Sequence, residues 1–488
     1  MSSSFFLKKE PKNNKKRKFQ GGPTGAGAKG KNKGKNIQDN PPVKKKPQKD
    51  DEEIASDSEY ESGLEGEGAP NLVFSSDEAE EETPQDKRLR LAKKYLEEIE
   101  KQEAEKAEDQ EIHDHVSHRL QTEYLDSVGK LRRNIAASIE GYDTENIVKL
   151  KHKKQHLPLC SLALSPDGEY LFSGAKTQFV LKWNLKTSRV EGAFNVQPHN
   201  EDKNTDIKRR SQVIALCISS DFRYLALADG GYTIQVWCPK ELKHLKTFHG
   251  HRDVVTSLVF RRDTHELYSA SRDRSVKIWS LDEMAYVESL FGHQAHVTGI
   301  DALSRERAIT SGGSDCTLRI WKITEESQLI YNGHSDSIEC VKFLNDENFI
   351  SGGTDGSIGL WNALKKKPLH TATLTHGVQS NGESNWITAL TCVVNTDLVA
   401  SGSCDGFIRL WQCAENFRKL KLLLQIPVDG FVNSLVFNSD GTKLYAAVGQ
   451  EHRWGRWWRM SEAKNSIMVI DLLRSTTEAT TSGKSKTK

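Results

Sequence analysis

Six units that end in tryptophan recur through the second two thirds of the chain and limit the folds open to it. They read SGAKTQFVLKW, LADGGYTIQVW, SASRDRSVKIW, SGGSDCTLRIW, SGGTDGSIGLW and SGSCDGFIRLW, and their tryptophans are 54, 42, 42, 40 and 50 residues apart. Three Gly-His pairs each stand just ahead of an apolar run. A period of about 40–45 residues with Gly-His before and Trp after is typical of the four-stranded blades of a β-propeller. The sequence therefore predicts an all-β, seven-bladed propeller over residues 145–474.

The seventh unit is incomplete by itself. Residues 431–449 supply two strands, and residues 466–472 can supply a third. The alternating stretch NIVKLKHKK at residues 146–154 is typical of an outer strand, and pairing it beside residues 466–472 would cover the edges of an open ring. A competing interpretation makes RWWRM the third strand and residues 466–472 the fourth. We favour closure by the N-terminal strand.

Under this closure, residues 450–464 form an enlarged loop between the second and third strands of blade seven. Two further insertions, residues 195–212 and 374–386, lie in connections between blades on the same face. Blades six, seven, one and two are contiguous in a closed ring, so the enlarged loops cluster on one side of that face. Because propeller loops carry function on a rigid scaffold, we expect a binding site there.

The blade-seven loop, GQEHRWGRWWRM, mixes arginine with tryptophan. Arg and Lys neutralise phosphates, and aromatic or guanidinium planes stack on unpaired bases. Trp457 and Trp458 are expected to be buried anchors of the loop, braced by Glu451 and His452, because large aromatic side chains bury well. The candidate RNA-binding or partner-binding residues are Arg453, Trp454, Arg456, Arg459, Lys208, Arg209, Arg210, Arg272 and Arg274.

The net charge of +2 hides a strong segregation of charge near the N-terminus. Residues 1–50 carry fifteen Lys and Arg against three acids, whereas residues 51–82 carry thirteen acids and no base. Low apolar content predicts that residues 1–84 are disordered, and residues 475–488 form a disordered C-terminal tail. The basic run Lys15, Lys16, Arg17 and Lys18 suits a nuclear-import signal. The alternative is a solvated tail that binds nucleic acid loosely.

Residues 85–140 are predicted to form a helical arm. Apolar residues recur every three or four positions between Ile112 and Ile139, which makes one apolar stripe. A nearly all-polar stretch, EKQEAEKAEDQE, precedes them. The arm is either a solvated linker helix or a partner-binding element.

Several classes of protein are disfavoured. All eight cysteines follow residue 150 and none forms a C-x-x-C pair, so we expect reduced thiols and no metal site. No apolar run approaches the ~20 residues that cross a bilayer, and the N-terminus has no signal-peptide pattern, so a soluble intracellular protein is expected. No G-x-S-x-G, P-loop or H-E-x-x-H motif is present, so we expect no enzyme and no cofactor.

The repeats resemble the WD-repeat family, in which a His, a Ser, an Asp and the Trp of a blade form a buried hydrogen-bonded tetrad. The first two units depart from it, with Thr177 and Gly231 at the Asp position, so we expect those blades to rely on apolar packing. Such repeated polar groups are structural rather than catalytic, since buried polar groups need partners. The tetrads implied by the resemblance are His251, Ser269, Asp273 and Trp279; His293, Ser311, Asp315 and Trp321; His334, Ser351, Asp355 and Trp361; and, in part, Ser401, Asp405 and Trp411.

A closer resemblance covers residues 87–472, through stretches such as FHGHRDVVTSLVF, EESQLIYNGH and VGQEHRWGRWWR. These look like the WD-repeat subunits of the U3 small nucleolar ribonucleoprotein. The resemblance implies a nucleolar RNA-binding scaffold that binds the box B/C element of U3 small nucleolar RNA beside the small kink-turn-binding protein of box C/D particles. It further implies a role with other small-subunit processome proteins in processing the precursor of 18S ribosomal RNA. The alternative is a WD-repeat protein–protein interaction hub without direct RNA binding.

Overall fold

The structure is a computed structural model that describes residues 90–97, 112–127, 131–196, 212–379, 381–456 and 458–475. The predictions for residues 1–84, for the import signal Lys15–Lys18 and for the insertion residues Lys208, Arg209 and Arg210 lie outside these ranges, as do Trp457 and residues 476–488.

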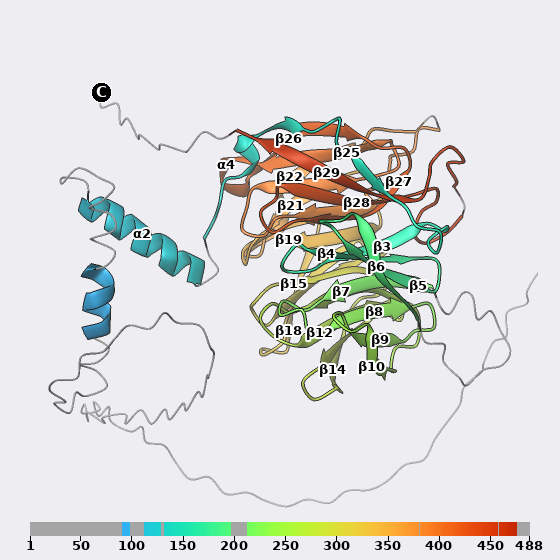
Figure 1. Ribbon diagram of the computed structural model, residues 1–488, viewed down its shortest axis with the longest axis horizontal. Helices are drawn as coiled ribbons and strands as arrows, with labels where there is room; N and C mark the ends of the chain where they lie inside the picture. The colour runs from blue at the N-terminus through green and yellow to red at the C-terminus, as the bar shows by residue number, and fades with distance from the viewer. Residues whose placement is uncertain are drawn as a thin grey trace, which may run out of the picture. The chain divides into compact units, whose positions relative to one another are not determined.

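In the described part of the chain, seven antiparallel sheets are arranged as the blades of a propeller, which confirms the predicted fold (Figure 1). The inner strands contact one another in ring order, and the inner strand of blade seven contacts that of blade one. Blades one to three contain β3 (Leu159–Leu164), β4 (Tyr170–Ala175), β5 (Phe179–Asn184), β6 (Arg189–Asn195), β7 (Val213–Ile218), β8 (Leu225–Asp229), β9 (Ile234–Cys238), β10 (Lys243–Phe248), β11 (Val255–Phe260), β12 (Glu266–Ser271), β13 (Ser275–Ser280) and β14 (Ala285–Phe291).

Blades four to seven follow the same order, with one short helix, α4 (Ala414–Phe417), between β25 and β26. Their strands are β15 (Val297–Ala302), β16 (Arg307–Gly312), β17 (Thr317–Lys322), β18 (Ser327–Asn332), β19 (Ile338–Phe343), β20 (Asn348–Gly353), β21 (Ile358–Asn362), β22 (Lys365–Ala372), β23 (Ala389–Cys392), β24 (Leu398–Gly402), β25 (Phe407–Cys413), β26 (Lys419–Pro427), β27 (Phe431–Phe437), β28 (Lys443–Gly449) and β29 (Ser466–Arg474).

Blade seven is closed by the N-terminal part of the propeller, as expected. Strand β2 (Val148–Leu150) pairs antiparallel with β29, with Val148 opposite Val469 and Leu150 opposite Ile467. A second segment, β1 (Ile139–Tyr142), pairs with the far end of β29 and was not anticipated. The outer strand of this blade is therefore built from two pieces, and together they cover an edge that would otherwise expose unpaired backbone groups.

The helical arm is shorter than predicted. Helix occurs at residues 90–97 and in α2 (Ile112–Ser127), but residues 131–142 are not α-helical. They contain one turn of 3-10 helix, η1 (Ala136–Ser138), and then enter β1. None of the described helices is long and apolar enough to cross a membrane.

The reason for the early helix end is that residues 131–142 are bound to the propeller. The backbone N–H groups of Ile135 and Ala136 both donate to Asp397 Oδ1, at 2.8 and 2.9 Å. Ala136 is fully buried and Ile139 is 8 % exposed, in the apolar core of blades six and seven. The apolar residues at the end of the apparent helical stripe therefore pack in the core of blades six and seven, and not on one face of a helix.

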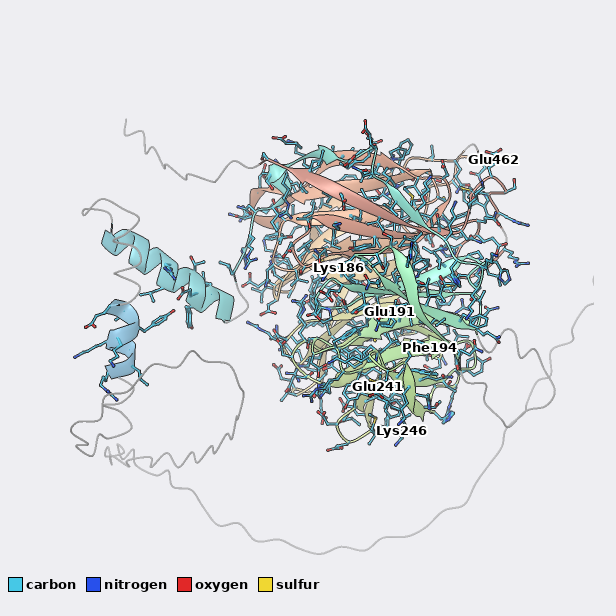
Figure 2. All side chains as sticks on the ribbon, in the orientation of Figure 1. Lys186, Glu191, Phe194, Glu241, Lys246 and Glu462 are labelled. Atoms are coloured by element: carbon cyan, nitrogen blue, oxygen red, sulfur yellow. The ribbon has the colours of Figure 1, made fainter. Side chains whose placement is uncertain are left out.

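The repeat tryptophans anchor the blades. All six are between 1 and 7 % exposed. In blade two, Trp237 lies 4.2 Å from Phe194 of blade one, measured between ring centroids. Phe194, on β6, is labelled in Figure 2. Burying rings of this size supplies much of the apolar contact between neighbouring sheets.

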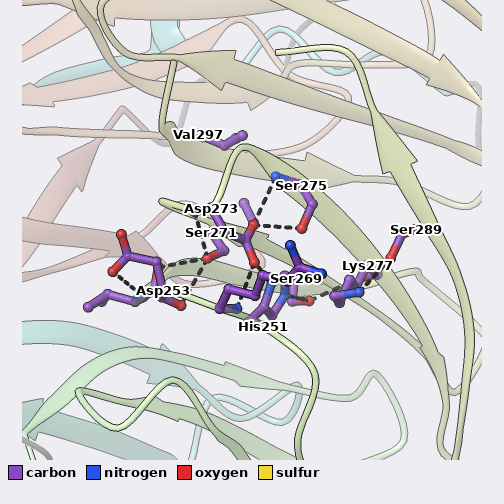
Figure 3. Close-up of polar contacts among 12 residues, drawn as sticks. His251, Asp253, Ser269, Ser271, Asp273, Ser275, Lys277, Ser289 and Val297 are labelled. Atoms are coloured by element: carbon purple, nitrogen blue, oxygen red, sulfur yellow. Dashed lines mark hydrogen bonds and ion pairs between the residues drawn. The ribbon is translucent and has the colours of Figure 1, made fainter. Parts of the chain in front are cut away.

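The tetrad of blade three is formed as expected, and Figure 3 shows three of its members, His251, Ser269 and Asp273. Trp279 Nε1 donates to Ser269 Oγ at 2.9 Å, and Ser269 Oγ lies 2.8 Å from His251 Nε2. His251 Nδ1 lies 2.9 Å from Asp273 Oδ2. Burial by itself would raise the pKa of Asp273, but hydrogen bonds from His251 and Ser275 outweigh it and hold this pKa well below its usual value. Blade five repeats the arrangement with His334, Ser351, Asp355 and Trp361.

In blade four, the prediction that Ser311 is the hydroxyl member of the tetrad is wrong. Its place is taken by Thr310, whose Oγ1 lies 2.9 Å from Trp321 Nε1 and 2.7 Å from His293 Nε2. The turn that leads to Asp315 is one residue longer than in blade three, so counting back from Asp315 selects the neighbouring residue. The side chain of Ser311 bonds instead to Thr298 Oγ1 at 2.8 Å.

Blade six has a complete tetrad, although only three members were predicted. His376 lies 2.8 Å from Ser401 Oγ and 2.9 Å from Asp405 Oδ1, and Trp411 Nε1 donates to Ser401. His376 follows Thr rather than Gly and stands 25 residues before its serine, because the insertion at residues 374–386 separates them.

Blades one and two depart from the tetrad, as predicted. In blade one, Gln155 takes the place of the histidine, accepting from Ser173 Oγ at 2.9 Å, and Trp183 Nε1 donates to the same oxygen. Thr177 Oγ1 is buried without a hydrogen-bond partner. In blade two, Trp237 Nε1 likewise has none among the described residues, so apolar packing holds this ring.

Candidate nucleic-acid interface

The blade-seven insertion is a folded loop between β28 and β29, which decides against RWWRM as a strand of the sheet. It doubles back on itself through a bridge between Glu451 and Arg459, and Met460 N donates to Gln450 O at 2.9 Å. At its base, Gln450 N donates to Asn465 Oδ1 at 2.9 Å. The predicted enlarged loop is therefore a small hairpin with its own internal hydrogen bonds.

A buried carboxylate holds three cations at the root of this hairpin. Glu451 is 3 % exposed, and its oxygens lie 3.1 Å from Arg456 Nε, 3.7 Å from Lys176 Nζ and 4.0 Å from Arg459 Nε. Burial lowers the pKa of Lys176, which also donates to His452 O at 2.7 Å. Three cations share one anion, so the cluster keeps an excess of positive charge beneath an exposed surface.

His452 braces the loop from the inside, as expected. It is 3 % exposed, and its ring lies edge-on to Trp386 at 6.2 Å and to Phe431 at 6.5 Å. Burial, with the nearby charges of Arg453 and Lys176, lowers the pKa of His452 to about 3, so the imidazole is neutral. Trp458 is partly buried and meets Phe431 edge-on at 5.3 Å, which fits its predicted role as an anchor.

The tip of the hairpin reaches across the mouth of the central channel. Arg453 N donates to Asn433 Oδ1 of β27, at 3.1 Å. The guanidinium carbon of Arg453 lies 5.0 Å from the Trp454 ring centroid, and that of Arg272 lies 4.5 Å from it. Arg272 belongs to the β12–β13 turn of blade three, which is not a neighbour of blade seven in the ring. The loop is thus held by β27 of its own blade and, at its tip, by Arg272 of blade three.

The channel beneath this tip is narrow and polar. The inner strands of all seven blades line a cavity of about 160 Å³, into which Arg453 also projects. Cys160 and Cys340 face it, and burial raises their pKa values to about 11 and about 12. All eight cysteines are unpaired. Within the described ranges, no three His, Cys, Asp or Glu side chains gather closely enough to hold a metal ion.

The predicted site residues thus differ in how exposed they are and in the contacts they make. Arg456 and Arg459 have side chains that are 68 and 60 % exposed. Arg274 is exposed at the blade-three turn, with a φ of 70°. Arg453 and Trp454 are partly buried, and the Trp454 ring is already engaged by two guanidinium groups. The structure brings Arg272, Arg453, Trp454, Arg456 and Arg459 together on one face.

Reasoning from sequence missed a second group of cations beside this loop. The connection from β2 into blade one contains Lys151, Lys153 and Lys154, all exposed, and Lys464 lies exposed at the base of the blade-seven loop. The signal was present in KLKHKK, but its alternation was interpreted only as a strand. Ring closure is what places these residues beside a loop some three hundred positions further along the chain.

The chain resembles known WD-repeat proteins in sequence and in structure. The family model "WD domain, G-beta repeat" matches residues 147–184, 242–280, 285–322, 325–362 and 372–412. Human "U3 small nucleolar RNA-interacting protein 2" is 51 % identical over 401 residues, covering 81 % of this chain and 83 % of that protein. The "U3 snoRNP-associated protein-like EMB2271" of Arabidopsis thaliana is 33 % identical over 478 residues, covering 92 % and 98 %. A crystal structure of RRP9 WD40 repeats is similar with a TM-score of 0.65 and 45 % identity, covering 69 % of this chain and all of that one.

Proposed function

The chain belongs to the WD-repeat family of U3 small nucleolar RNA-interacting protein 2, and from this premise we propose that it is a non-enzymatic, RNA-binding scaffold subunit of the U3 small nucleolar ribonucleoprotein. The observation that carries the proposal is the high identity over most of both chains to a human protein whose name states an interaction with that RNA. The cationic loop face supports it, because RNA affinity depends largely on neutralising phosphates.

The finer proposal concerns the RNA element and the pathway. The chain binds the box B/C element of U3 small nucleolar RNA, beside the small kink-turn-binding protein of box C/D particles. With other small-subunit processome proteins, it supports assembly of the processome and processing of the precursor of 18S ribosomal RNA. Its place of action is then the nucleus, and within it the nucleolus.

The contact surface in this proposal is the loop face over blades seven, one and three. Exposed guanidinium groups of Arg456, Arg459, Arg272 and Arg274 are placed to bond phosphate oxygens or stack on unpaired bases. Arg453 and Trp454 contribute by shaping the tip. Lys208, Arg209 and Arg210, which lie outside the described residues, are proposed as further RNA contacts from the sequence alone.

Ultraviolet crosslinking in cells, followed by sequencing of the bound RNA, tests the proposal. Arg456→Ala is compared with Arg223→Ala, a matched control in the β7–β8 turn on the opposite face. Arg223 is 72 % exposed and lies 3.1 Å from Asp221, just as Arg456 lies 3.1 Å from Glu451. Loss of one phosphate contact should weaken RNA association about 4- to 5-fold near physiological salt, and the control should bind like the wild type.

Two results would contradict the proposal. If no single small nucleolar RNA dominates the crosslinked reads, the chain is not a subunit of the U3 particle. If partners instead survive ribonuclease and high salt while RNA is lost, the protein is an interaction hub whose partners are proteins. Equal binding by the Arg456 and Arg223 variants would remove Arg456 from the contact surface.

A further inference from the structure

The ring-closing seam forms a shallow basic depression of about 420 Å³. We call it the closure pocket. One wall is the connection that follows β2, and the other is the base of the blade-seven loop. Its basic side chains are Lys151, Lys153, Lys464, His152 and His156.

The charge of these lysines is not paired within the described part of the chain. In the described ranges, no carboxylate lies within ion-pair distance of Lys151, Lys153 or Lys464, and all three are exposed. The contrast with nearby cations is clear, since Arg456 and Arg459 share Glu451 and Lys149 lies 3.6 Å from Asp429 Oδ2. Asp429 and Glu462 line the adjoining hollow with Lys151 and Lys464, but neither is ion-paired with these two lysines. The seam therefore presents three lysines without an ion-pair partner among the described residues.

The closure pocket is also held rigidly. Asn465 Nδ2 donates to His156 O at 2.8 Å, which joins the two walls directly. Asn465 Oδ1 accepts from Gln450 N, and the pairing of Lys149 with Met468 in the β2–β29 ladder fixes the approach to Lys151. A site with its backbone held in this way loses little backbone entropy when a ligand binds.

The side chains that line the closure pocket indicate which kind of ligand it binds. Every side chain that lines the closure pocket is a lysine, a histidine or a neutral amide, and no carboxylate or apolar side chain is among them. Protein partners depend on buried aromatic or aliphatic anchors, which this depression lacks. Ammonium groups and amides are instead suited to phosphate oxygens and ribose hydroxyls.

We propose that the closure pocket grips the sugar–phosphate backbone of the bound RNA through Lys151, Lys153 and Lys464. This inference rests on the proposed function and deepens it. It assigns the principal phosphate contacts to the seam between the two ends of the propeller, beside the arginine-rich loop.

The test uses the full chain and a radiolabelled transcript of U3 small nucleolar RNA, with affinity measured across a series of salt concentrations. Lys151→Gln, Lys153→Gln and Lys464→Gln are combined in one variant. The matched control combines Lys365→Gln, Lys366→Gln and Lys367→Gln, which removes the same charge from an exposed lysine run. That run begins β22 after the β21–β22 hairpin, on the opposite face of blade five.

The seam variant should lose about 100-fold in affinity near 0.15 M salt, and its salt slope should fall by about 2–3, because three phosphate contacts are lost. The control should match the wild type, and both variants should keep the wild-type melting temperature. If the wild type binds and the seam variant binds equally well, or if both triple variants lose the same affinity, the closure pocket is not the contact and the proposed function stands. If the wild-type chain does not bind the transcript either alone or with the small kink-turn-binding protein present, both proposals fail. If RNA binding is unchanged but the seam variant loses a ribonuclease-resistant protein partner, the pocket binds an acidic protein and the inference is overturned.

Discussion

Replacing Thr310 with Val should destabilise blade four far more than replacing Ser311 with Ala. The Thr310 hydroxyl is fully buried and lies 2.9 Å from Trp321 Nε1 and 2.7 Å from His293 Nε2. Valine keeps the shape of threonine but removes both bonds and leaves two buried ring nitrogens unpaired. At roughly 1–3 kcal/mol for each group left unpaired, the free energy of unfolding should fall by about 2–6 kcal/mol.

The Ser311 substitution has a smaller expected effect. Its hydroxyl bonds to Thr298 Oγ1, and Thr298 keeps a bond to Ile338 O after the change. With no orphaned group, a loss below about 1 kcal/mol is expected. The propeller's size implies an unfolding entropy of about 0.7 kcal/mol/K, so the melting temperature should fall by about 3–9 °C for Thr310→Val and by about 1 °C for Ser311→Ala.

Differential scanning calorimetry of the full chain measures both shifts, with Thr310→Ser as the control that restores the hydroxyl. The reasoning would be refuted if Ser311→Ala lowered the melting temperature more than Thr310→Val. It would also be refuted if Thr310→Val matched Thr310→Ser, because the hydroxyl would then contribute nothing.

Two further predictions concern histidines. His376→Ala removes two buried hydrogen bonds, to Ser401 and Asp405, and leaves a cavity, so the free energy of unfolding should fall by about 2–4 kcal/mol. His370→Ala on partly exposed β22 should change the urea midpoint little, and similar midpoints for the two variants would contradict the blade-six tetrad. For His452, the folded pKa of about 3 lies below the unfolded value of ~6.5, so the unfolded chain binds the proton first as the pH falls. The contribution of His452 to the free energy of unfolding is thus complete above about pH 6.5 and is lost at about 1.4 kcal/mol per pH unit towards pH 3. The urea midpoint of His452→Gln should therefore fall less steeply than that of the wild type between pH 6.5 and 5. A parallel fall in the two proteins would contradict the buried neutral state.

The propeller could be predicted because its signals are local and repeated. A tryptophan at the third strand of six blades and alternation in residues 146–154 suffice to count the blades and to close the ring. The tetrad of blade four could not be placed by counting, because one additional residue in its turn shifts the register between Asp315 and the strand before it. His376 was missed for a similar reason, since an insertion moved it out of the usual spacing.

The candidate site was less accessible from sequence, because its geometry depends on contacts between distant segments. The arginines and tryptophans of the blade-seven loop were visible, but not the reach of Trp454 to Arg272 in blade three. That contact exists only because the loop crosses the channel mouth. The helical pattern before residue 140 was likewise misleading, since Ile139 packs in a sheet core that forms only after the ring closes.

Ring closure links stability and the proposed binding surface in one segment. Strand β2 covers the open edge of β29, and the same stretch of chain continues into Lys151 and Lys153. A deletion that removes this segment would expose a sheet edge and delete the lysines at once, so loss of RNA binding by such a truncation says nothing about which role failed. Substitution separates the roles, because the lysine side chains are exposed while the strand pairing is made by the backbone. Charge changes at the seam, with strand pairing intact, are therefore the informative perturbation of this face.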